Sequence, residues 1–404
     1  MTVIALAVAW IAVACVILAT AYRQSISEAW REPALRAQVM ILESDDWGYG
    51  PIEQCGILQR LAEALAAHRD QSGRHPVMTL GVVLAGPDTA AMRSEGWRNY
   101  RRLGIDDGRL VEIRGAMLAG VKRGVFALQL HGREHFWPDC LMRAAERSPE
   151  LREWLAASDM PRTELLPSPL QSRWTNAERL PSQSLPVDAI RSEAAAEVRA
   201  FAEAFGTMPE VAVPPTFLWN QDVEAAWAAA GVRIVVTPGQ RNTGRDADGD
   251  LVREPHDIRN AARGANGCMY VVRDVYFEPA LGHEHARAVD DVIAKCRLGR
   301  PALVEIHRAN FLADRATAER AIDEFSRFLG EVMARLPNVR FMSTAELAAH
   351  FRDVSQMVET RTLPRLHFLL RRLSGIPRLR KLAWITGAII PVGLAYAITR
   401  PRPC

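Results

Sequence analysis

Acidic and basic side chains with the spacing of a metal site follow two apolar runs. In ILESDDWGYG (residues 41–50), Asp45 and Asp46 stand side by side, and a divalent cation would offset their repulsion. In LQLHGREHFWP (residues 128–138), His131 and His135 are four residues apart, so that on a helical turn both imidazoles would face one way. Two imidazoles and a carboxylate from another strand form a common open metal site. We therefore expect Asp46, His131 and His135 to bind a divalent ion, with Zn²⁺ as the first candidate.

Other groups near this site could move protons. A divalent ion lowers the pKa of a water molecule toward neutrality, and Asp45 within hydrogen-bond reach would take the proton. His307, at the end of ALVEIH, would protonate a leaving amine, and Arg273 or Asp274 in VVRDVYFEP would orient or tune it. A metal, a base and an acid together are sufficient to hydrolyse an amide.

Strands and helices alternate through the middle of the chain. Continuous β-branched runs predict buried strands, at residues 39–42, 77–84, 125–130, 211–213, 232–236, 269–272, 302–306 and 339–342. Helical patterns lie between them, at residues 55–68, 140–157, 187–205, 222–230, 286–297 and 316–335, and a capping box at Ser343 begins a further helix. This alternation predicts an α/β fold, a distorted (β/α) barrel with 7–8 parallel strands over residues 37–355. An open doubly wound sheet is the alternative.

The expected strand ends explain how distant residues would meet. In a (β/α) barrel the chemistry lies beyond the carboxyl ends of the strands, where all the residues above fall. The stretch from Pro161 to Pro186, rich in proline and serine, reads as a long loop that could cover this face.

Several function classes are disfavoured. A net charge of +3 over 404 residues is too small to indicate a nucleic-acid partner. No GxGxxG follows a strand and no GxxxxGK[ST] is present, so we expect no nucleotide cofactor. The six cysteines are scattered and form neither a disulfide framework nor a zinc-finger pattern.

Hydrophobic helices are expected at both ends of the chain. Residues 2–21 carry no charge over the length that spans a bilayer, and no Lys or Arg precedes them. An uncleaved anchor over residues 1–22 is therefore preferred to a cleaved signal peptide. Residues 361–381 mix bulky apolar and basic side chains, as in a juxtamembrane segment on anionic lipid, and residues 382–398 would span the membrane or lie in its interface. Membrane lipid is thus an expected partner.

Basic residues indicate an orientation in the cell membrane. Three arginines, at 23, 31 and 36, follow the first apolar segment, and five basic residues between 371 and 381 precede the second. Only Arg400 and Arg402 come after it. The positive-inside rule then places the barrel of an integral membrane protein on the cytoplasmic side. A periplasmic or extracellular domain on a signal anchor stays open.

The motifs resemble those of the polysaccharide deacetylase family, the NodB-type hydrolases. SDDWG (residues 44–48), HGREH (131–135) and EIHRANF (305–311) are similar to its first, second and last motifs. The resemblance covers residues 38–346. It implies hydrolytic removal of an N- or O-acyl group from an amino sugar or acylated glycan. Asp45 would be the base, His307 the acid, and Asp46, His131 and His135 the ligands.

The chain departs from the family pattern at two places. Trp47 stands where glycine usually follows the second aspartate, and AVPPTFLWN lacks the arginine that tunes the base. Arg273 is the candidate replacement. These departures indicate a divergent member.

Substrate contacts and rival functions complete the expectations. Aromatic rings near strand ends stack on sugars, and the candidates are Trp47, Trp137 and Trp219, together with Pro215. If both apolar ends hold the active face near a bilayer, a lipid-linked sugar is a candidate substrate. The alternatives are a glycosidase that uses two carboxylates without metal, and a catalytically silent glycan- or lipid-binding module.

Overall fold

A parallel β-sheet forms the centre of the molecule. The computed structural model describes residues 2–400, so Met1 of the predicted anchor and Arg402 of the charge count lie outside the described residues. All eight predicted strands are present. Their bounds are β1 Gln38–Gly48, β2 Met78–Val83, β5 Phe126–Leu130, β8 Val211–Ala212, β9 Ile234–Thr237, β12 Met269–Val272, β14 Ala302–His307 and β15 Val339–Phe341. The order β12-β9-β8-β5-β2-β1-β14-β13 is parallel throughout, and β15 pairs with the start of β1.

One short segment joins the two edges of this sheet. β12 pairs with β9, whereas β13 (Val275–Tyr276) pairs with β14 at the opposite edge. Only Arg273 and Asp274 separate β12 from β13. The sheet therefore curls into a distorted (β/α) barrel, as predicted, and Arg273 lies at the point of closure.

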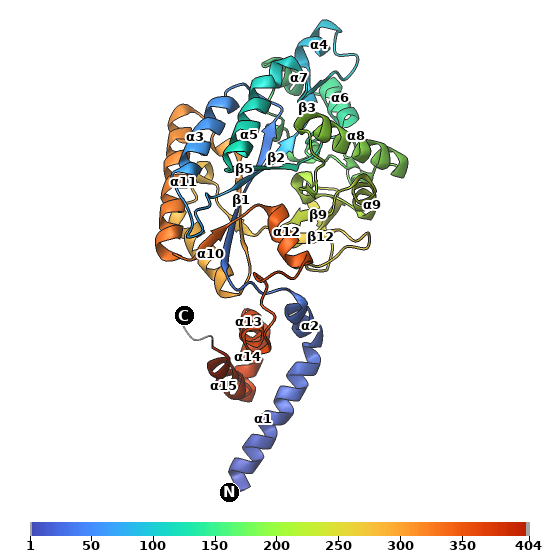
Figure 1. Cartoon of the computed structure of the whole chain (residues 1–404). Coiled ribbons are helices and arrows are strands. Elements are labelled where there is room, and N and C mark those ends of the chain that lie inside the picture. The colour runs from blue at the N-terminus through green and yellow to red at the C-terminus, as the bar shows by residue number, and fades with distance from the viewer. Residues whose placement is uncertain (1, 401–404) are drawn as a thin grey trace.

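Helices surround the barrel (Figure 1). The helices of the barrel are α3 Gln54–Ala66, α4 Thr89–Ser94, α5 Val111–Arg123, α6 Pro138–Arg147, α7 Pro149–Ala156, α8 Val187–Phe205, α9 Gln221–Ala230, α10 His285–Arg297, α11 Arg315–Arg335 and α12 Thr344–Arg352. The helix predicted over 140–157 is divided, because Ser148 caps a new helix that begins at Pro149. The α5 helix was not predicted, since Gly115 and Gly120 weaken its pattern.

The short remaining strands pair as hairpins: β3 Ala85–Pro87 with β4 Arg102–Gly104, β6 Thr175–Asn176 with β7 Gln183–Ser184, and β10 Asn242–Arg245 with β11 Leu251–Arg253.

Successive side chains of β1 point to opposite faces of the sheet and pack in two separate layers of the core. Met40 and Leu42 pack with the apolar cluster of the outer helices. Val39 and Ile41 pack instead with other strands and with Leu347 of α12. The α12 helix, with its predicted capping box, therefore contributes to the core beside the beginnings of the strands.

The terminal helices gather at one end of the barrel. Figure 1 shows these helices below the end where β1 begins: α1 (Thr2–Ala21), α2 (Arg23–Arg31), α13 (Thr362–Ser374), α14 (Pro377–Thr386) and α15 (Ile389–Thr399). Arg372 of α13 (Thr362–Ser374) donates hydrogen bonds to the carbonyls of Pro33 and Gly299, which precede β1 and β14. The carboxyl ends of the strands point the other way. The expectation that both apolar ends hold the active face near a bilayer is thus wrong.

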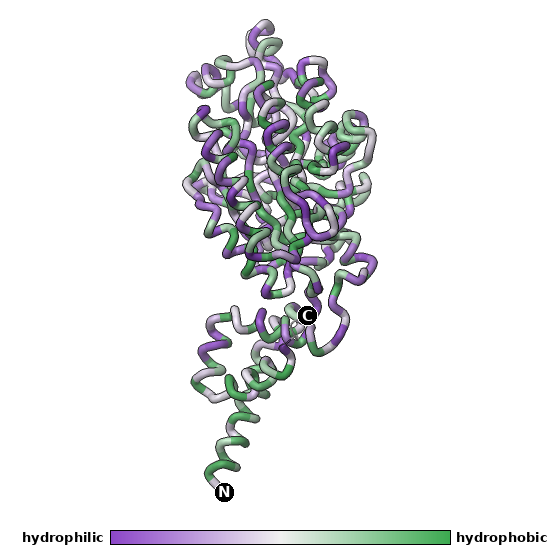
Figure 2. The backbone as a smooth tube through the Cα atoms, turned by 60° about the vertical axis from the view of Figure 1, so that its left-hand side comes forward, coloured by the Kyte–Doolittle hydropathy of each residue, from purple (hydrophilic) through white to green (hydrophobic). Residues whose placement is uncertain are grey.

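The apolar segments differ in shape. Among residues 2–400, α1 is the single helix that is long and apolar enough to cross a membrane, and a signal sequence would share these properties. Figure 2 shows that α1 is mostly green, the hydrophobic colour, with a few pale segments. The segment 382–398 is not one straight helix: α14 (Pro377–Thr386) and α15 (Ile389–Thr399) pass the same test only as a pair bent by 112°. The predicted juxtamembrane segment is mostly α13, which packs on α2 and buries His367 and Leu369.

Candidate metal and acid–base site

A β-bulge in β1 brings two neighbouring aspartates to one face. Between Ser44 and Trp47 the chain advances three residues, while its partner β2 advances two, from Leu80 to Val82. Asp46 has a φ of 74°, which is costly for a residue with a side chain. Without the extra residue, Asp45 and Asp46 would point to opposite faces of the sheet. The bulge instead lets both carboxylates line one cavity.

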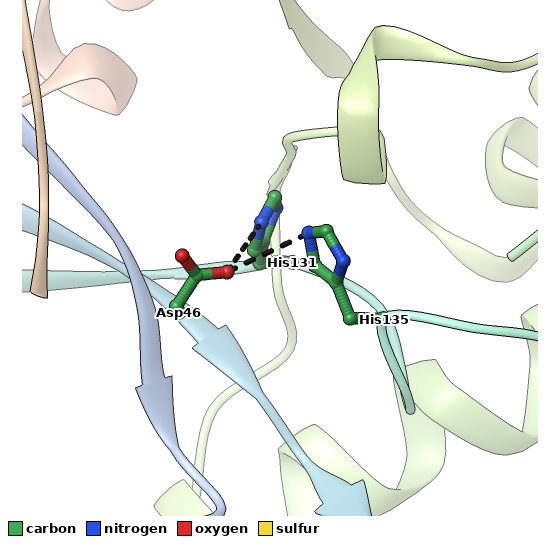
Figure 3. A group of neighbouring side chains, drawn as sticks. All are labelled: Asp46, His131 and His135. Atoms are coloured by element: carbon green, nitrogen blue, oxygen red, sulfur yellow. Dashed lines mark ion pairs between the residues drawn. The ribbon is translucent and has the colours of Figure 1, made fainter. Parts of the chain in front are cut away.

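The three predicted metal ligands converge in space. Nε2 of His131 and Nε2 of His135 each lie 3.5 Å from Oδ1 of Asp46. Figure 3 shows both rings turned toward this one oxygen. Two ligands that each lie about 2.1 Å from one ion at a tetrahedral angle are about 3.4 Å apart. The HxxxH segment is not a helical turn, however: it is a bend with Gly132 at a φ of 89°.

Unsatisfied polar atoms fit a cation at this point. Oδ1 of Asp46 is buried and accepts no hydrogen bond from any described residue. Nδ1 of His131 lies 2.9 Å from the carbonyl of Val213, and an N–H donated there leaves Nε2 with its lone pair. Burial lowers the pKa of His135 to about 4, so that this imidazole is neutral near pH 7. Asp45 and Asp46 raise the pKa of His131 against burial, so that these carboxylates favour a positive charge at this point, which a divalent ion would supply in place of a proton. The donor set therefore suits a divalent ion.

Asp45 is held by Arg273 in the barrel interior. Nη2 of Arg273 lies 2.6 Å from Oδ2 of Asp45. Burial raises the pKa of Asp45, but the positive charge and hydrogen bond of Arg273 outweigh this and keep it below its ordinary value. Both groups are about 1% exposed. Arg273, the candidate that the sequence offered, thus contacts Asp45 from the closing segment of the barrel.

Arg273 also binds two further carboxylates. Its Nη1 lies 3.2 Å from Oε2 of Glu43, and its Nε lies 3.0 Å from Oε2 of Glu305. Thr344 donates to the other oxygen of Glu43. Burial raises the pKa of Glu43 to about 7, against the attraction of Arg273. One buried cation is therefore shared among three acids.

His307 has a carboxylate partner that the sequence did not suggest. Its Nδ1 lies 2.6 Å from Oε1 of Glu278, and Asn310 donates to the second oxygen of Glu278. Burial lowers the pKa of His307, but the hydrogen bond and charge of Glu278 raise it overall to about 10. His307 is thus protonated near pH 7, as a general acid must be. Asp274 does not contact it, because its side chain pairs with Lys295.

A second group of possible ligands consists of Glu278, Glu305 and His307. Its atoms already have partners: Glu278 accepts from Asn310, and Glu305 accepts from Arg273. The unsatisfied oxygen of Asp46 distinguishes the first group. We therefore interpret the second group as an acid–base pair with its supporting carboxylate.

The two candidate groups, around Asp46 and around His307, line one cavity of about 630 Å³. The long loop after Pro161 forms one wall, through Arg162, Glu164, Leu165 and Gln171. Glu164 fixes this wall to the barrel through Arg308, at 2.8 Å, and Arg308 is 1% exposed. The first part of this loop therefore forms a wall of the cavity, on the face where the sequence predicted the loop.

The four predicted substrate contacts lie elsewhere. None of Trp47, Trp137, Pro215 and Trp219 lines the cavity. Trp47 and Trp219 are 0% exposed within the core, and Nε1 of Trp47 donates to Oγ of Ser44. Trp47 continues the strand after the bulge, where its side chain packs with the outer helices. The expectation that it walls the substrate pocket is wrong.

The residues that do line the cavity left weaker signals in the sequence. Phe217, Tyr276 and Leu281 supply apolar surface, and Phe217 has a φ of 51° that no pattern predicts. Glu305 was detectable as the one charged residue inside the apolar run ALVEI. Glu278 is the second residue after β13, in YFEP, and such an acid beyond a strand end is a recognisable signal.

Comparisons with known proteins found similarity in structure alone. No family model and no curated protein matches the chain. A family 4 carbohydrate esterase from Streptomyces lividans is 15% identical, with 76% of this chain and 93% of that chain covered and a TM-score of 0.34. A peptidoglycan deacetylase from Bacillus subtilis is 11% identical, with 79% and 94% covered and a TM-score of 0.37. A family 4 pseudoenzyme from Bacillus anthracis is 10% identical, with 77% and 66% covered and a TM-score of 0.36. Sequence identities and TM-scores this low carry no argument about the reaction. The reaction must therefore be inferred from the side chains of this chain.

Proposed function

We propose that this chain is a metal-dependent hydrolase that removes an acyl group from an amino sugar or acylated glycan. The observation that carries the proposal is the convergence of Asp46, His131 and His135 on one unsatisfied oxygen, with an arginine-held Asp45 in the same cavity. A protonated His307 lines this cavity as well. The motif resemblance supplies the acylated sugar as the substrate class.

Each group has a role that its surroundings support. When bound, a divalent ion would polarise the acyl carbonyl and lower the pKa of a water molecule. Asp45, kept ionised by Arg273, would accept the proton of that water. His307, kept protonated by Glu278, would donate a proton to the leaving nitrogen or oxygen. The cavity walls would orient the sugar and limit access of bulk water.

We further propose that α1 anchors the chain in the cell membrane, with the barrel on the cytoplasmic side as the flanking charges predict. The six residues of β14 separate the helical end of the barrel from the site by about 20 Å. A substrate in solution or a long glycan fits this geometry better than a sugar held at the bilayer surface.

The decisive test is acyl release from acetylated glucosamine oligomers by the purified full chain. We expect activity that a chelator abolishes and that added Zn²⁺ or another divalent ion restores. Asp45→Asn should lose activity while it keeps the ion.

The rival functions give different results. Glycosidic cleavage that survives the chelator would support a metal-free glycosidase and would end the present proposal. Oligomer binding without any turnover, unaffected by Asp45→Asn, would indicate a silent binding module. Release of acyl groups with no bound metal would also contradict the proposed mechanism.

A further inference from the structure

A basic cavity lies at the opposite end of the barrel from the catalytic groups. It has a volume of about 640 Å³ and lies between the start of β1, the ends of α10 and α11, and α13. Six basic side chains line it and no carboxylate does: Arg36, Arg297, Arg335, His367, Arg371 and Arg400. Charges of one sign around a recess repel one another and concentrate anions there.

Three of the five arginines have no acidic partner among residues 2–400, and burial lowers the pKa of His367, so that its ring carries no charge near pH 7. Arg36 pairs with Glu359 and Arg335 with Asp290, so their charges are compensated. Among residues 2–400, no carboxylate pairs with Arg297, Arg371 or Arg400. These three guanidinium groups are therefore available to an anionic ligand.

The central arginine is held in place before any ligand arrives. Nε of Arg371 donates to the hydroxyl of Tyr396 at 2.8 Å, and Nη1 donates to the carbonyl of Arg297 at 2.8 Å. The ring of Tyr396 stacks on that of His367, with centroids 4.5 Å apart. A fixed, planar guanidinium suits the oxygens of a phosphate better than a mobile one.

An apolar groove continues from the basic cavity. A second cavity, of about 550 Å³, shares Arg297 and Arg371 with the first and is otherwise lined mostly by apolar residues of α10, α13 and α15. A third, of about 240 Å³, shares Leu370, Ile389 and Val392 with the second and reaches α1. Cations at one end and hydrocarbon along the rest match an amphiphile with an anionic head.

We propose that these three adjoining cavities form one cleft that binds an anionic membrane lipid, with its phosphate among Arg297, Arg371 and Arg400 and its acyl chains along α13 and α15. The proposal concerns a second site and uses only the anchoring role of α1 from the proposed function. Arg and Lys beside a spanning helix are attracted to anionic headgroups. The cleft lies where such headgroups would meet the base of the barrel.

The bound lipid would hold the barrel in a defined orientation. Arg372, the neighbour of Arg371, donates to the carbonyls of Ala29, Pro33 and Leu298 and so joins α13 to the chain around α2 and α10. A lipid that binds α13 is thereby coupled to the barrel, and the catalytic cavity faces away from the membrane.

The test uses the full chain in a neutral detergent. We expect dioctanoyl phosphatidic acid to bind at least about 10-fold more tightly than dioctanoyl phosphatidylcholine, measured by native mass spectrometry and by the rise in unfolding temperature. Arg371→Gln should weaken the binding of phosphatidic acid at least about 10-fold. Arg378→Gln is the matched control, since it removes the same charge from an exposed position of α14 outside the cavity. It should change the affinity less than 2-fold, within the scatter of exposed charges.

Several outcomes would overturn the proposal. Equal affinity for the two lipids would show that the anionic headgroup is not recognised. Equal losses of affinity for phosphatidic acid in Arg371→Gln and Arg378→Gln would show that the attraction is non-specific. Inorganic pyrophosphate that binds as tightly as phosphatidic acid would assign the cavity to a soluble phosphate ligand. If Arg371→Gln does not fold, Arg400→Gln gives the same comparison at the end of α15. None of these outcomes bears on acyl hydrolysis, which is measured separately.

Discussion

A side chain at Gly81 would occupy the space that Asp45 needs. Gly81 lies on β2 beside the bulge of β1, and a Cβ there would be 2.3 Å from Oδ1 and 3.3 Å from Cα of Asp45. Because backbone and a buried ion pair are involved, the contact cannot be relieved by a simple rotation. The position of Asp45, the proposed base, therefore depends on the absence of a side chain at Gly81 in the neighbouring strand.

Gly81→Ala should displace Asp45 and reduce the turnover number. Misplacement of a catalytic group by about 1 Å costs on the order of 100-fold in rate, and we expect a loss of that size. The three atoms nearest this Cβ all belong to Asp45, so we expect the metal content to be retained. The measurements are kcat and metal content of the same preparation. Gly56→Ala in α3, where a Cβ meets nothing within 4 Å, is the control and should leave kcat unchanged.

Asp46→Asn and Asp45→Asn should differ in metal affinity, because Asp46 is the proposed ligand and Asp45 the proposed base. The Asp46→Asn variant lacks the charge of the oxygen on which both imidazoles converge, and we expect metal affinity to fall by at least about 100-fold. Asp45→Asn should bind metal like the unaltered chain but should not turn over. Metal analysis after dialysis against a weak chelator distinguishes the two. Equal metal loss in both variants would show that Asp45 is a ligand and not the base.

Glu278→Gln should change the alkaline side of the pH profile. The pKa of His307 is raised to about 10 mainly by Glu278, against burial, so that the acid stays protonated until high pH. With a neutral partner the pKa falls, and activity should be lost at a pH at least one unit lower. A bound divalent ion would lower both values but not reverse their order. An unchanged alkaline limit in kcat/KM would exclude His307 as the acid.

Glu197→Gln should remove a pH dependence of stability. Glu197 is 0% exposed and accepts from the indole of Trp227 at 2.6 Å. Burial raises its pKa to about 7, above the ordinary 4.5 and against the attraction of Arg173. The folded protein therefore binds this proton more tightly than the unfolded chain does. The stabilisation is fully present below pH 4.5 and is lost as the pH rises through about 7, by about 3 kcal/mol in free energy of unfolding.

Urea unfolding at several pH values checks this expectation. The difference in unfolding free energy between Glu197→Gln and the unaltered chain should grow as the pH rises from 4.5 to 7, in favour of the variant. Glu203→Gln, at an exposed position of the same helix α8, is the control and should give a pH-independent difference. A pH-independent difference for Glu197→Gln as well would contradict the shifted pKa.

The sequence by itself determined the strands and the three side chains that converge at the candidate metal site. Apolar β-branched runs are local signals, and every run predicted as a strand became one, because buried parallel strands need continuous apolar faces. Once the strand ends were known, barrel topology placed Asp46, His131 and His135 at one rim. The fold class followed from the same alternation.

Tertiary structure decided which neighbours support these groups: the sequence offered Arg273 as a candidate, but the pairings of Arg273 with Asp45 and of Glu278 with His307 are long-range contacts. The bulge that turns Asp46 inward depends on pairing with β2, and the partners Arg273 and Glu278 come from the segment that closes the barrel. Trp47 and Trp219 are apolar side chains that packing drew into the core, so aromatic type alone did not predict contact with substrate. The direction of the catalytic face relative to the apolar ends also depended on how α13 docks. Such relations join residues far apart in the chain, and local pattern carries no information about them.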